Sequence, residues 1–440
     1  PMDHAFGHLL GLFRHPDGTS FTEDEAKGCM TRLRKYPETP GQPVFQSYHA
    51  DADPDSFHFL PSGSVGIPPV ASAYLALAHR YGRDHGHNLS ERAQYWSLIG
   101  DSEFREGSLL EAMPDVAERK LGNVTWIIDY NRQNLDGTRI PNTKSHDTRD
   151  CDRIEAMALA NDWQVVQLRH GSYRFELFEK TGGSALQHWI EHVLPDYDYQ
   201  LLLFGRNATA VREAARRDHA GAAKILDDLS DVDVLHFMGD VGGHDILGIA
   251  KAMQESRLDQ NTPTMLIVHT VKGFGMECYA DPSNHSALPS KKELTSILEE
   301  RGLTFDQPFE LFEEGTDEAA FLRFRGKAQM EGKTAVRELA MKNKAELRAK
   351  YDAQGGLPDS LNIDLSLFPT VHTQWMWGQI ASKLIRIGTT EQGGPQMAGA
   401  DRGLTEEEKL WKIIAELVVT MSPDVGTSTN LAPGMDSRIY

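Results

Sequence analysis

Two runs of mostly apolar residues, 95–99 and 124–128, stand out in the hydrophobic pattern of the chain. Neither run shows the strict polar alternation of a half-exposed strand, and 124–128 is typical of a strand buried on both faces of a parallel sheet. Residues 103–111, between the runs, open with acidic side chains, as helices often do. The stretch 95–138 therefore predicts a strand, a tight turn, a helix, a second strand and a loop.

The same reasoning predicts further helices and strands along the chain. Strands are expected at 163–168 and 265–269, and an apolar strand-turn pattern at 417–424 suggests the start of another α/β domain. Helices are expected at 23–34 (with Thr22 as N-cap), 70–81, 151–161, 184–193, 211–217, 246–253, 314–353, 373–387 and 404–417. The alternation of strands and helices predicts an α/β fold with a parallel sheet.

Length and charge limit the possible functions. The chain has 440 residues, enough for two or more domains. Its net charge of −19 argues against nucleic acid or an anionic membrane as the main partner. There is no apolar run of the ~18 residues that a membrane-spanning helix needs. Three widely spaced cysteines match no zinc pattern and favour a reducing compartment, so the expected location is the cytoplasm.

Polar residues follow both central strands. Asp101 comes directly after the first strand, and Asn131 follows the second. Parallel strands deliver such residues to the carboxyl edge of the sheet, where α/β folds bind ligands. A carboxylate, a carboxamide oxygen and a backbone carbonyl suit Mg²⁺ or Ca²⁺, with water and a diphosphate completing the shell. The alternative is structural, because Gly, Asp and Asn are also ordinary turn residues.

The two halves together resemble the thiamine diphosphate motif, in which Gly-Asp-Gly precedes an asparagine at a strand end by about thirty residues. Gly100-Asp101 and Asn131 have this spacing, and Leu135-Asp136-Gly137 follows. Ser102 departs from the motif, since glycine usually stands there. If that position needs a positive φ, serine costs about 1 kcal/mol.

Other segments resemble one branch of these enzymes in chain order. They are Gly7-His8, Ser47-Tyr48-His49, the turn 59–66, Trp163, 171–174, 198–200, 243–245 and 269–275. With the central motif, they make most of the chain, from about residue 7 to 425, similar to the homodimeric-type pyruvate dehydrogenase decarboxylating component. That family belongs to the transketolase-like thiamine diphosphate superfamily.

The resemblance implies a parallel-sheet, transketolase-like fold and a role for each matching position. The domains would be a diphosphate-binding domain at 1–305, a helical linker at 306–360 and the beginning of a pyrimidine-binding domain at 361–440. The Mg²⁺ ligands would be Asp101, Asn131 and the backbone carbonyl of Gln133. The cofactor-binding residues would be Val65, Gly100, Asp101, Ser102, Glu103, Asp129, Asn131 and Lys272. The catalytic residues facing the substrate would be His8, His285 (on a mobile loop) and His49.

The implied activity is oxidative decarboxylation of a 2-oxo acid, most often pyruvate, with transfer of the acyl group to a lipoyl group. A glutamate of the pyrimidine-binding domain activates the cofactor in this family, and the sequence ends before that position. The expected partners are therefore the C-terminal remainder of the polypeptide or a second subunit, within a homodimer, and a lipoyl acyltransferase component is a further candidate. Two alternatives stay open: ketol transfer between sugar phosphates, and a cofactor-binding subunit without catalysis.

Overall fold

The computed structural model describes residues 2–33, 35–45, 54, 66–138, 149–363, 372–390 and 403–420. The chain forms two compact units, residues 1–327 and 328–440. The division falls inside the long helix α14 (Asp317–Ala353), within the stretch that the sequence assigns to a helical linker.

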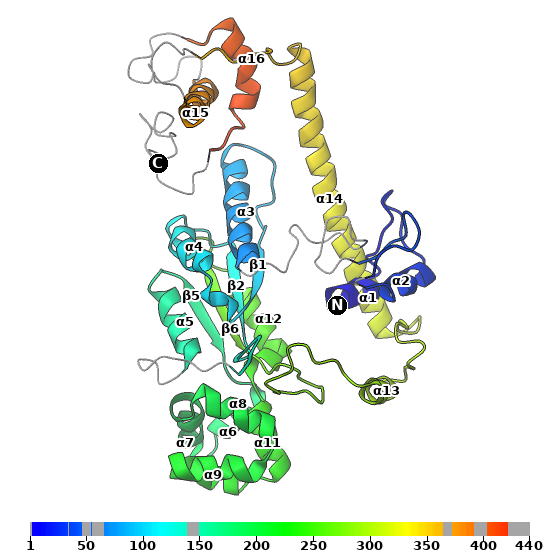
Figure 1. Cartoon of the computed structure of the whole chain (residues 1–440), viewed down its shortest axis with the longest axis vertical. Coiled ribbons are helices and arrows are strands. Elements are labelled where there is room, and N and C mark those ends of the chain that lie inside the picture. Colours follow the sequence, from blue (N-terminus) through cyan, green and yellow to red (C-terminus); the bar gives the residue numbers. More distant parts are fainter. Residues whose placement is uncertain are drawn as a thin grey trace. The chain divides into compact units, whose positions relative to one another are not determined.

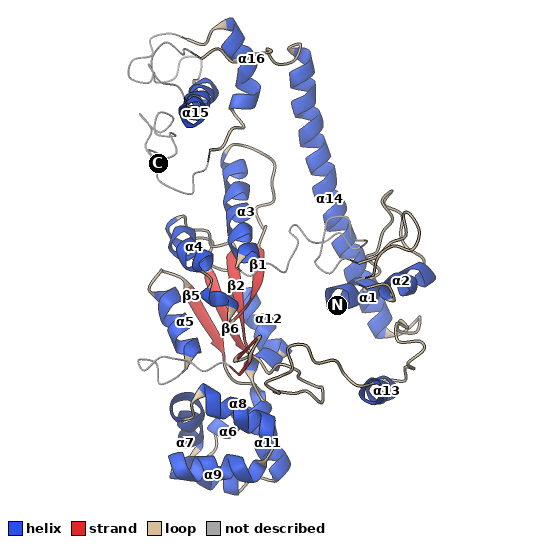
Figure 2. Cartoon of the chain, viewed as in Figure 1, coloured by secondary structure: helices blue, strands red, loops and turns tan. Residues whose placement is uncertain are grey.

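The first unit is built on a parallel sheet, which confirms the predicted fold class. In the described residues the strands lie in the order β1 (Tyr95–Gly100), β2 (Val124–Tyr130), β6 (Thr264–His269) and β5 (Gln164–Leu168), as Figure 2 shows. Each neighbouring pair is parallel. All six side chains of β6 are buried, as expected for a central strand. The short strands β3 (Gln133–Asn134) and β4 (Gly137–Thr138) form a separate antiparallel ribbon directly after β2.

Helices cover the two faces of the sheet unequally (Figure 1). On one face, α3 (Ile67–Asp84), α4 (Gly107–Glu118) and α5 (Asp150–Leu159) pack on a large apolar core. The largest fully buried side chain of this core is that of Trp126, which contacts Trp163 at a ring-centroid distance of 4.6 Å. On the other face, α12 (Ile246–Glu255) packs on Leu266 and Val268 of the central strand.

The α12 side of the sheet stays open at β1. Leu98 lies in register with Ile127, which packs under α12, so the two side chains share a face. Leu98 is nevertheless 73% exposed. Two residues at the start of α12, Ile246 and Leu247, are exposed as well. The first unit thus presents apolar side chains at this edge of the sheet.

A second apolar core lies beyond the carboxyl ends of the strands (Figure 1). It belongs to a set of helices, called here the helical cluster: α6 (Ser172–Phe178), α7 (Gly183–His188), η2 (Trp189–Val193), α8 (Asp196–Gly205), α9 (Ala208–Asp218), α10 (Ala220–Asp227) and α11 (Asp231–Gly239). The single helix predicted at 184–193 is an α-helix that continues into one π-helical turn. Val271 and Ala280, which follow β6, also pack into this core and so tie the cluster to the sheet.

The N-terminal segment forms a smaller core of its own. Its helices are α1 (Met2–Leu9) and α2 (Glu23–Met30), and Phe13, Cys29 and Phe45 are its buried centre. Thr22 caps α2 in a capping box with Glu25, as its sequence position predicts, although the helix ends at Met30 and not at residue 34. Helix α13 (Lys291–Glu299) follows β6 farther along the chain.

The second unit contains the pair α15 (Thr373–Thr389) and α16 (Glu406–Ala415). The helices approach so closely that a Cβ on Gly388 would lie 2.5 Å from the carbonyl oxygen of Ala415. Of the strand-turn pattern predicted at 417–424, residues 417–420 are described and form no strand, and the rest lies outside the described residues.

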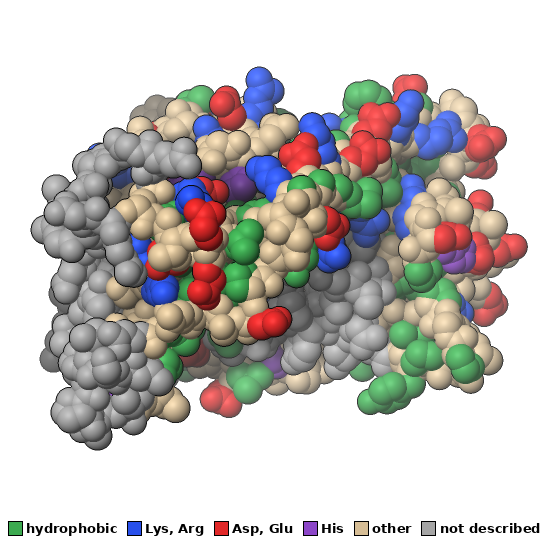
Figure 3. All heavy atoms as spheres, turned by 90° about the horizontal axis from the view of Figure 1, so that it is seen from above, with side chains coloured by type: hydrophobic (Ala, Val, Ile, Leu, Met, Phe, Trp, Pro, Cys, Tyr) green, Lys and Arg blue, Asp and Glu red, His purple; other side chains and the backbone are tan. Residues whose placement is uncertain are grey.

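None of the described helices is long and apolar enough to cross a membrane. Where Figure 3 shows described residues, acidic and basic side chains lie interspersed.

Candidate functional site

Asp101 stands at the carboxyl end of β1 and is the centre of the candidate site. Its side chain is 1% exposed. One carboxylate oxygen, Oδ2, accepts a hydrogen bond of 2.8 Å from the backbone N–H of Arg132. The backbone N–H of Asp101 donates to the carbonyl of Asp129, 3.2 Å away. The parallel register, which pairs Gly100 with Asp129, therefore brings the end of β1 against the turn that follows β2.

The turn after β2 presents the other predicted metal ligands. Asn131 Oδ1 accepts from the backbone N–H of Gln133 at 2.9 Å, and its Nδ2 donates to Asp129 Oδ2 at 3.3 Å. Arg132 has a φ of 62°, a left-handed conformation that is rare for a residue with a side chain. In this conformation, the backbone N–H of Arg132 points at the carboxylate of Asp101. The carbonyl of Gln133 accepts from the hydroxyl of Ser102 at 3.4 Å.

Ser102 does not need a positive φ. Its dihedral angles are φ −75° and ψ −36°, in the right-handed helical region, and it precedes the short 3-10 turn η1 (Glu103–Arg105). The cost considered for a serine in a left-handed conformation therefore does not arise here. The single helix predicted from residue 103 is instead this 3-10 turn, followed by α4 from Gly107.

Glu103 joins the end of β1 to the start of α3. Its Oε2 accepts from the backbone N–H of Gly100 at 3.1 Å, and its Oε1 accepts from the N–H of Gly66 at 2.9 Å. Gly66 is the N-cap of α3 and has a φ of 78°. A Cβ there would lie 2.8 Å from the Cβ of Glu103's near neighbour Glu106. The carboxylate of Glu103 is thus engaged by backbone amides, which identifies it as a positioning group for this edge.

Lys272 and His285 lie together on the segment after β6. Lys272 Nζ is 3.1 Å from His285 Nδ1. Burial lowers the pKa of Lys272, and the carboxylates of Asp129 and Asp101 act in the opposite direction, so the ammonium group faces the same strand ends. Gln133 fixes this segment to the turn after β2, because its Nε2 donates to the carbonyl of Asp281 at 2.9 Å.

The predicted catalytic histidines are not all brought to this edge. His8 is 5% exposed in the N-terminal core, where its Nε2 lies 2.8 Å from the carbonyl of Phe309 and its ring lies 6.1 Å from that of Phe13. His285 contacts Lys272, as described above. His49 and Val65 lie outside the described residues.

Two residues at the site were not singled out by the sequence. Arg132 is 2% exposed, and its guanidinium donates to the carbonyl of Thr270 at 2.7 Å. Thr270 in turn donates its hydroxyl proton to Asp129 Oδ1. Each belongs to a segment that the sequence did mark, 131–133 and 269–275, but an arginine or threonine at a strand end carries no signal of its own.

The residues fit a bound Mg²⁺ by donor chemistry. Asp101, Asn131 and the carbonyl of Gln133 are oxygen donors, the kind that Mg²⁺ prefers. A group of three or more His, Cys, Asp or Glu side chains placed to hold a metal is absent from the described residues. The predicted magnesium ligands are one carboxylate, one carboxamide and one backbone carbonyl, so they are not a group of that kind.

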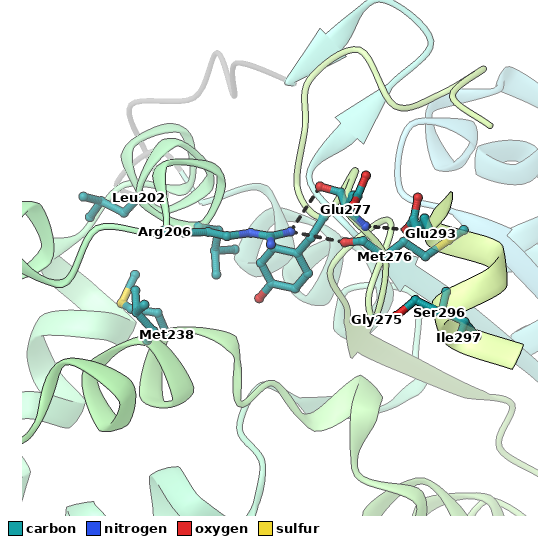
Figure 4. A pocket seen from close by; sticks show the side chains of 12 residues that line it. Leu202, Arg206, Met238, Gly275, Met276, Glu277, Glu293, Ser296 and Ile297 are labelled. Atoms are coloured by element: carbon teal, nitrogen blue, oxygen red, sulfur yellow. Dashed lines mark hydrogen bonds between the residues drawn. The ribbon is translucent and has the colours of Figure 1, made fainter. Parts of the chain in front are cut away.

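A well-formed cavity lies elsewhere in the first unit. It has a volume of about 520 Å³ and is lined mainly by apolar side chains from α8, α11, α13 and the segment 275–279. Figure 4 shows Arg206 at this cavity, donating to the carbonyls of Met276 and Glu277, and the backbone N–H of Glu277 donating to the carboxylate of Glu293. None of the predicted site residues that the structure describes lines it. Its size therefore does not identify it as the site of the predicted chemistry.

Comparison with known families gives a partial match. The family model described as "Transketolase, thiamine diphosphate binding domain" matches residues 232–357. This match includes Lys272 and His285 but not β1 or β2.

Curated relatives extend the similarity along the chain. Proteins named pyruvate dehydrogenase E1 component are similar to it: that of Corynebacterium glutamicum is 26% identical over 255 residues (58% of this chain and 26% of the relative). That of Escherichia coli (strain K12) is 25% identical over 326 residues (72% and 35%). That of Pseudomonas aeruginosa is 27% identical over 283 residues (62% and 30%). The matched part of the chain thus spans about a quarter to a third of the length of these relatives.

Solved structures of transketolases are also similar. A transketolase from Pichia stipitis is 18% identical with a TM-score of 0.48, and the match covers 85% of this chain and 43% of that one. A transketolase from Campylobacter jejuni is 13% identical with a TM-score of 0.47, covering 87% and 44%.

Proposed function

We propose that this chain, a member of the transketolase-like thiamine diphosphate superfamily, binds the diphosphate end of thiamine diphosphate for the oxidative decarboxylation of a 2-oxo acid. The observation that carries the proposal is the joining of Asp101 and the turn 131–133 at one sheet edge by the Arg132 hydrogen bond. The names of the curated relatives support a 2-oxo acid, with pyruvate as the proposed substrate and a lipoyl group as the proposed acyl acceptor.

In this proposal, Asp101, Asn131 and the carbonyl of Gln133 hold Mg²⁺, which neutralises part of the diphosphate charge. Lys272 adds a second cation on the β6 side of the same edge. Glu103 contributes indirectly, because it fixes the Gly100 and Gly66 backbone amides. When bound, thiamine diphosphate supplies the carbanion chemistry of the reaction.

The imidazole of His285 is the group in this region best placed to exchange a proton with substrate. It is exposed, and it stands beside the Lys272 ammonium. A neutral ring nitrogen next to an ammonium group accepts its hydrogen bond, which places the ring proton on the other nitrogen. That proton can pass to a substrate oxygen while Nδ1 takes a proton from Lys272. His8 and His49 stay proposals for the same task.

The proposed assembly is a homodimer that also needs the C-terminal remainder of a longer polypeptide. The exposed Leu98 beside α12 supports a covering partner for this face of the sheet. The share of the relatives that the chain spans supports the need for further polypeptide. A lipoyl acyltransferase component is a further proposed partner.

Calorimetric titration with thiamine diphosphate and Mg²⁺ tests the proposal. We expect Mg²⁺-dependent binding that Asp101→Ala weakens at least about tenfold, because a charged metal ligand is lost. The matched control is Asp136→Ala, which removes an exposed carboxylate from the neighbouring ribbon and should leave the affinity unchanged. Equal affinity of Asp101→Ala and the unaltered chain would refute the metal assignment.

Turnover of the chain together with its C-terminal remainder tests the substrate. We expect reduction of an artificial electron acceptor with pyruvate and none with a pentose phosphate pair. Activity with the sugars alone would replace the proposal by ketol transfer. Cofactor binding without turnover of either substrate would identify a binding subunit.

A further inference from the structure

A small buried cavity lies between the carboxyl ends of β5 and β6 and the helical cluster. Its volume is about 30 Å³. The charged side chains that line it are Arg132, Arg149, Arg169, Arg174, Glu191 and Asp196. Four guanidinium groups thus meet two carboxylates at a site that neither the proposed reaction nor the relatives' names explain.

The carboxylates near the cavity are already engaged. Asp196 accepts the hydroxyl proton of Tyr130 and the backbone N–H of Asp150. Glu191 is bound by His170, whose Nε2 lies 2.7 Å from Glu191 Oε1. Asp152, outside the lining, pairs with both Arg149 and Arg169.

The other two arginines make their hydrogen bonds to neutral groups. Arg174 donates to the carbonyls of Phe237 and Met238 and to the hydroxyl of Tyr199. Arg132 donates to the carbonyl of Thr270 and lies 3.4 Å from a ring nitrogen of His269. Arg132 Nε is buried and has no hydrogen-bond partner among the described residues.

The lining side chains carry more positive than negative charge, with four guanidinium groups against the carboxylates of Glu191 and Asp196. His269, which also lines it, has a pKa well below the ordinary value because of burial and because of Arg132, Arg169 and Arg174. A neutral ring adds no balancing charge. Buried guanidinium groups are stable when they are paired and all their N–H groups are bonded.

We propose that this cavity binds one small monovalent anion, a halide or a carboxylate of formate size. The anion would accept from Arg132 Nε and would balance the guanidinium groups that face neutral partners. The volume limits its size, because 10–15 Å³ holds roughly one water molecule. A nucleotide, a sugar phosphate or the diphosphate of the cofactor is too large, so the site is distinct from the one at Asp101.

Crystals of the full chain grown or soaked in bromide provide the deciding test, since bromide scatters anomalously. We expect an anomalous peak inside the cavity, within hydrogen-bonding distance of Arg132 Nε. Absence of the bromide peak, together with absence of formate density at the same place in formate-soaked crystals, overturns the proposal. So does electron density showing that a carboxylate from the chain itself, outside the described residues, fills the cavity.

Thermal unfolding in different salts of equal ionic strength tests the same site in solution. Chloride and formate should raise the midpoint of unfolding in a saturable way, because a ligand that binds the folded state stabilises it. Gluconate, which is too large for the cavity, should not. The stronger of chloride and formate identifies the preferred class of anion, and equal midpoints in all three salts would contradict the proposal.

A variant pair links the salt effect to the cavity. Arg169→Gln removes one lining cation and should weaken the apparent chloride affinity about tenfold, because the cavity loses one positive charge close to the anion. Arg216→Gln removes an exposed arginine, paired with Asp227 on the helical cluster, and should leave the affinity unchanged. An equal chloride response of both variants and the unaltered chain would refute the assignment, and if Arg169→Gln fails to fold, the bromide peak in the unaltered chain decides.

Discussion

Ser102 illustrates at the scale of one residue what a departure from a motif costs. Because its φ is −75°, the backbone there gains nothing from glycine. Glycine would add freedom to the unfolded chain, so Ser102→Gly should lower the free energy of unfolding by about 0.5–1 kcal/mol. Urea titration of the chain without cofactor measures this free energy. In the opposite substitution, Gly107→Ala in the first turn of α4, the added Cβ meets no atom within 4 Å, so the free energy of unfolding should rise. A more stable Ser102→Gly would contradict the helical conformation.

His269 predicts how stability depends on pH. Burial, followed by the nearby arginines, holds the pKa of its folded form well below 6.5. As the pH falls below about 6.5, this histidine therefore becomes protonated in the unfolded chain but stays neutral in the folded chain. The free energy of unfolding therefore decreases as the pH falls. One such histidine contributes about 1.4 kcal/mol of loss between pH 7.5 and 5.5.

Replacing His269 by Asn should remove that share of the pH dependence. Urea unfolding at pH 7.5 and 5.5 gives the difference, and the pair pH 8.5 and 7.5 is the control, since the ring is neutral in both states there. An undiminished loss of stability between pH 7.5 and 5.5 in His269→Asn would show that other groups cause it. His170, whose pKa burial also lowers, contributes in the same direction and stays in the variant.

At the scale of elements, burial explains which predictions held. The strands β2 and β6 agree with the predicted runs within two residues, because fully buried apolar segments carry a pattern that no surface element shares. Short helical turns that differ from an α-helix only in their hydrogen-bond pattern could not be predicted, because they produce no periodic pattern of apolar residues in the sequence. Examples are the 3-10 turn at 103–105 and the π-helical turn at 189–193.

The candidate site divides in the same way. Asp101 and Asn131 were predictable because strand ends of a parallel sheet meet at one edge. The bridging role of Glu103 was not, because it depends on Gly66, which is far away in sequence. The left-handed Arg132 was not predictable either, since nothing in an arginine favours a positive φ.

Helix α14 offers a matched pair of glycines. A Cβ on Gly326 would lie 1.9 Å from the carbonyl oxygen of Leu10, whereas one on Gly332 would meet nothing within 4 Å. Gly332→Ala should therefore raise the free energy of unfolding by about 0.5–1 kcal/mol through helix propensity. Gly326→Ala should lower it, because the backbone at Leu10 has to move.

Differential scanning calorimetry of the two variants compares them, and limited proteolysis reports where the change acts. Cleavage within the N-terminal segment should accelerate in Gly326→Ala and not in Gly332→Ala. Equal stabilisation by both substitutions would show that α14 does not hold the N-terminal segment at this point.

At the scale of the whole molecule, the proposed dimer makes a prediction about the open sheet face. Leu98→Lys places a charge among exposed apolar side chains, so it should weaken self-association at least about tenfold if a second copy covers them. Sedimentation equilibrium measures the association. Val336→Lys, at an exposed position of α14, is the control and should leave it unchanged. Identical association of all three proteins would place the dimer contact elsewhere.

The exposure of this face could not be predicted from the sequence, because the exposed and the buried residues of β1 are both apolar. Trp96 is 40% exposed, whereas Ile99 on the opposite face is fully buried. What distinguishes them is the number of helices available to each face, which follows from the connections between strands and not from any local run.

The strand order also determines when this sheet can form as the chain is made. Strands β1 and β2 can pair as soon as both are synthesised, but β5 is synthesised before the neighbour it pairs with. Residues 169–263, including the helical cluster, separate it from β6, so the cluster has the opportunity to fold first. Strand β6 must then enter between β2 and β5 and close two long loops, which makes its insertion the expected slow step of folding. Until Thr264 has emerged from the ribosome, β2 and β5 carry unpaired edges, and that interval is when the nascent chain is most prone to aggregate.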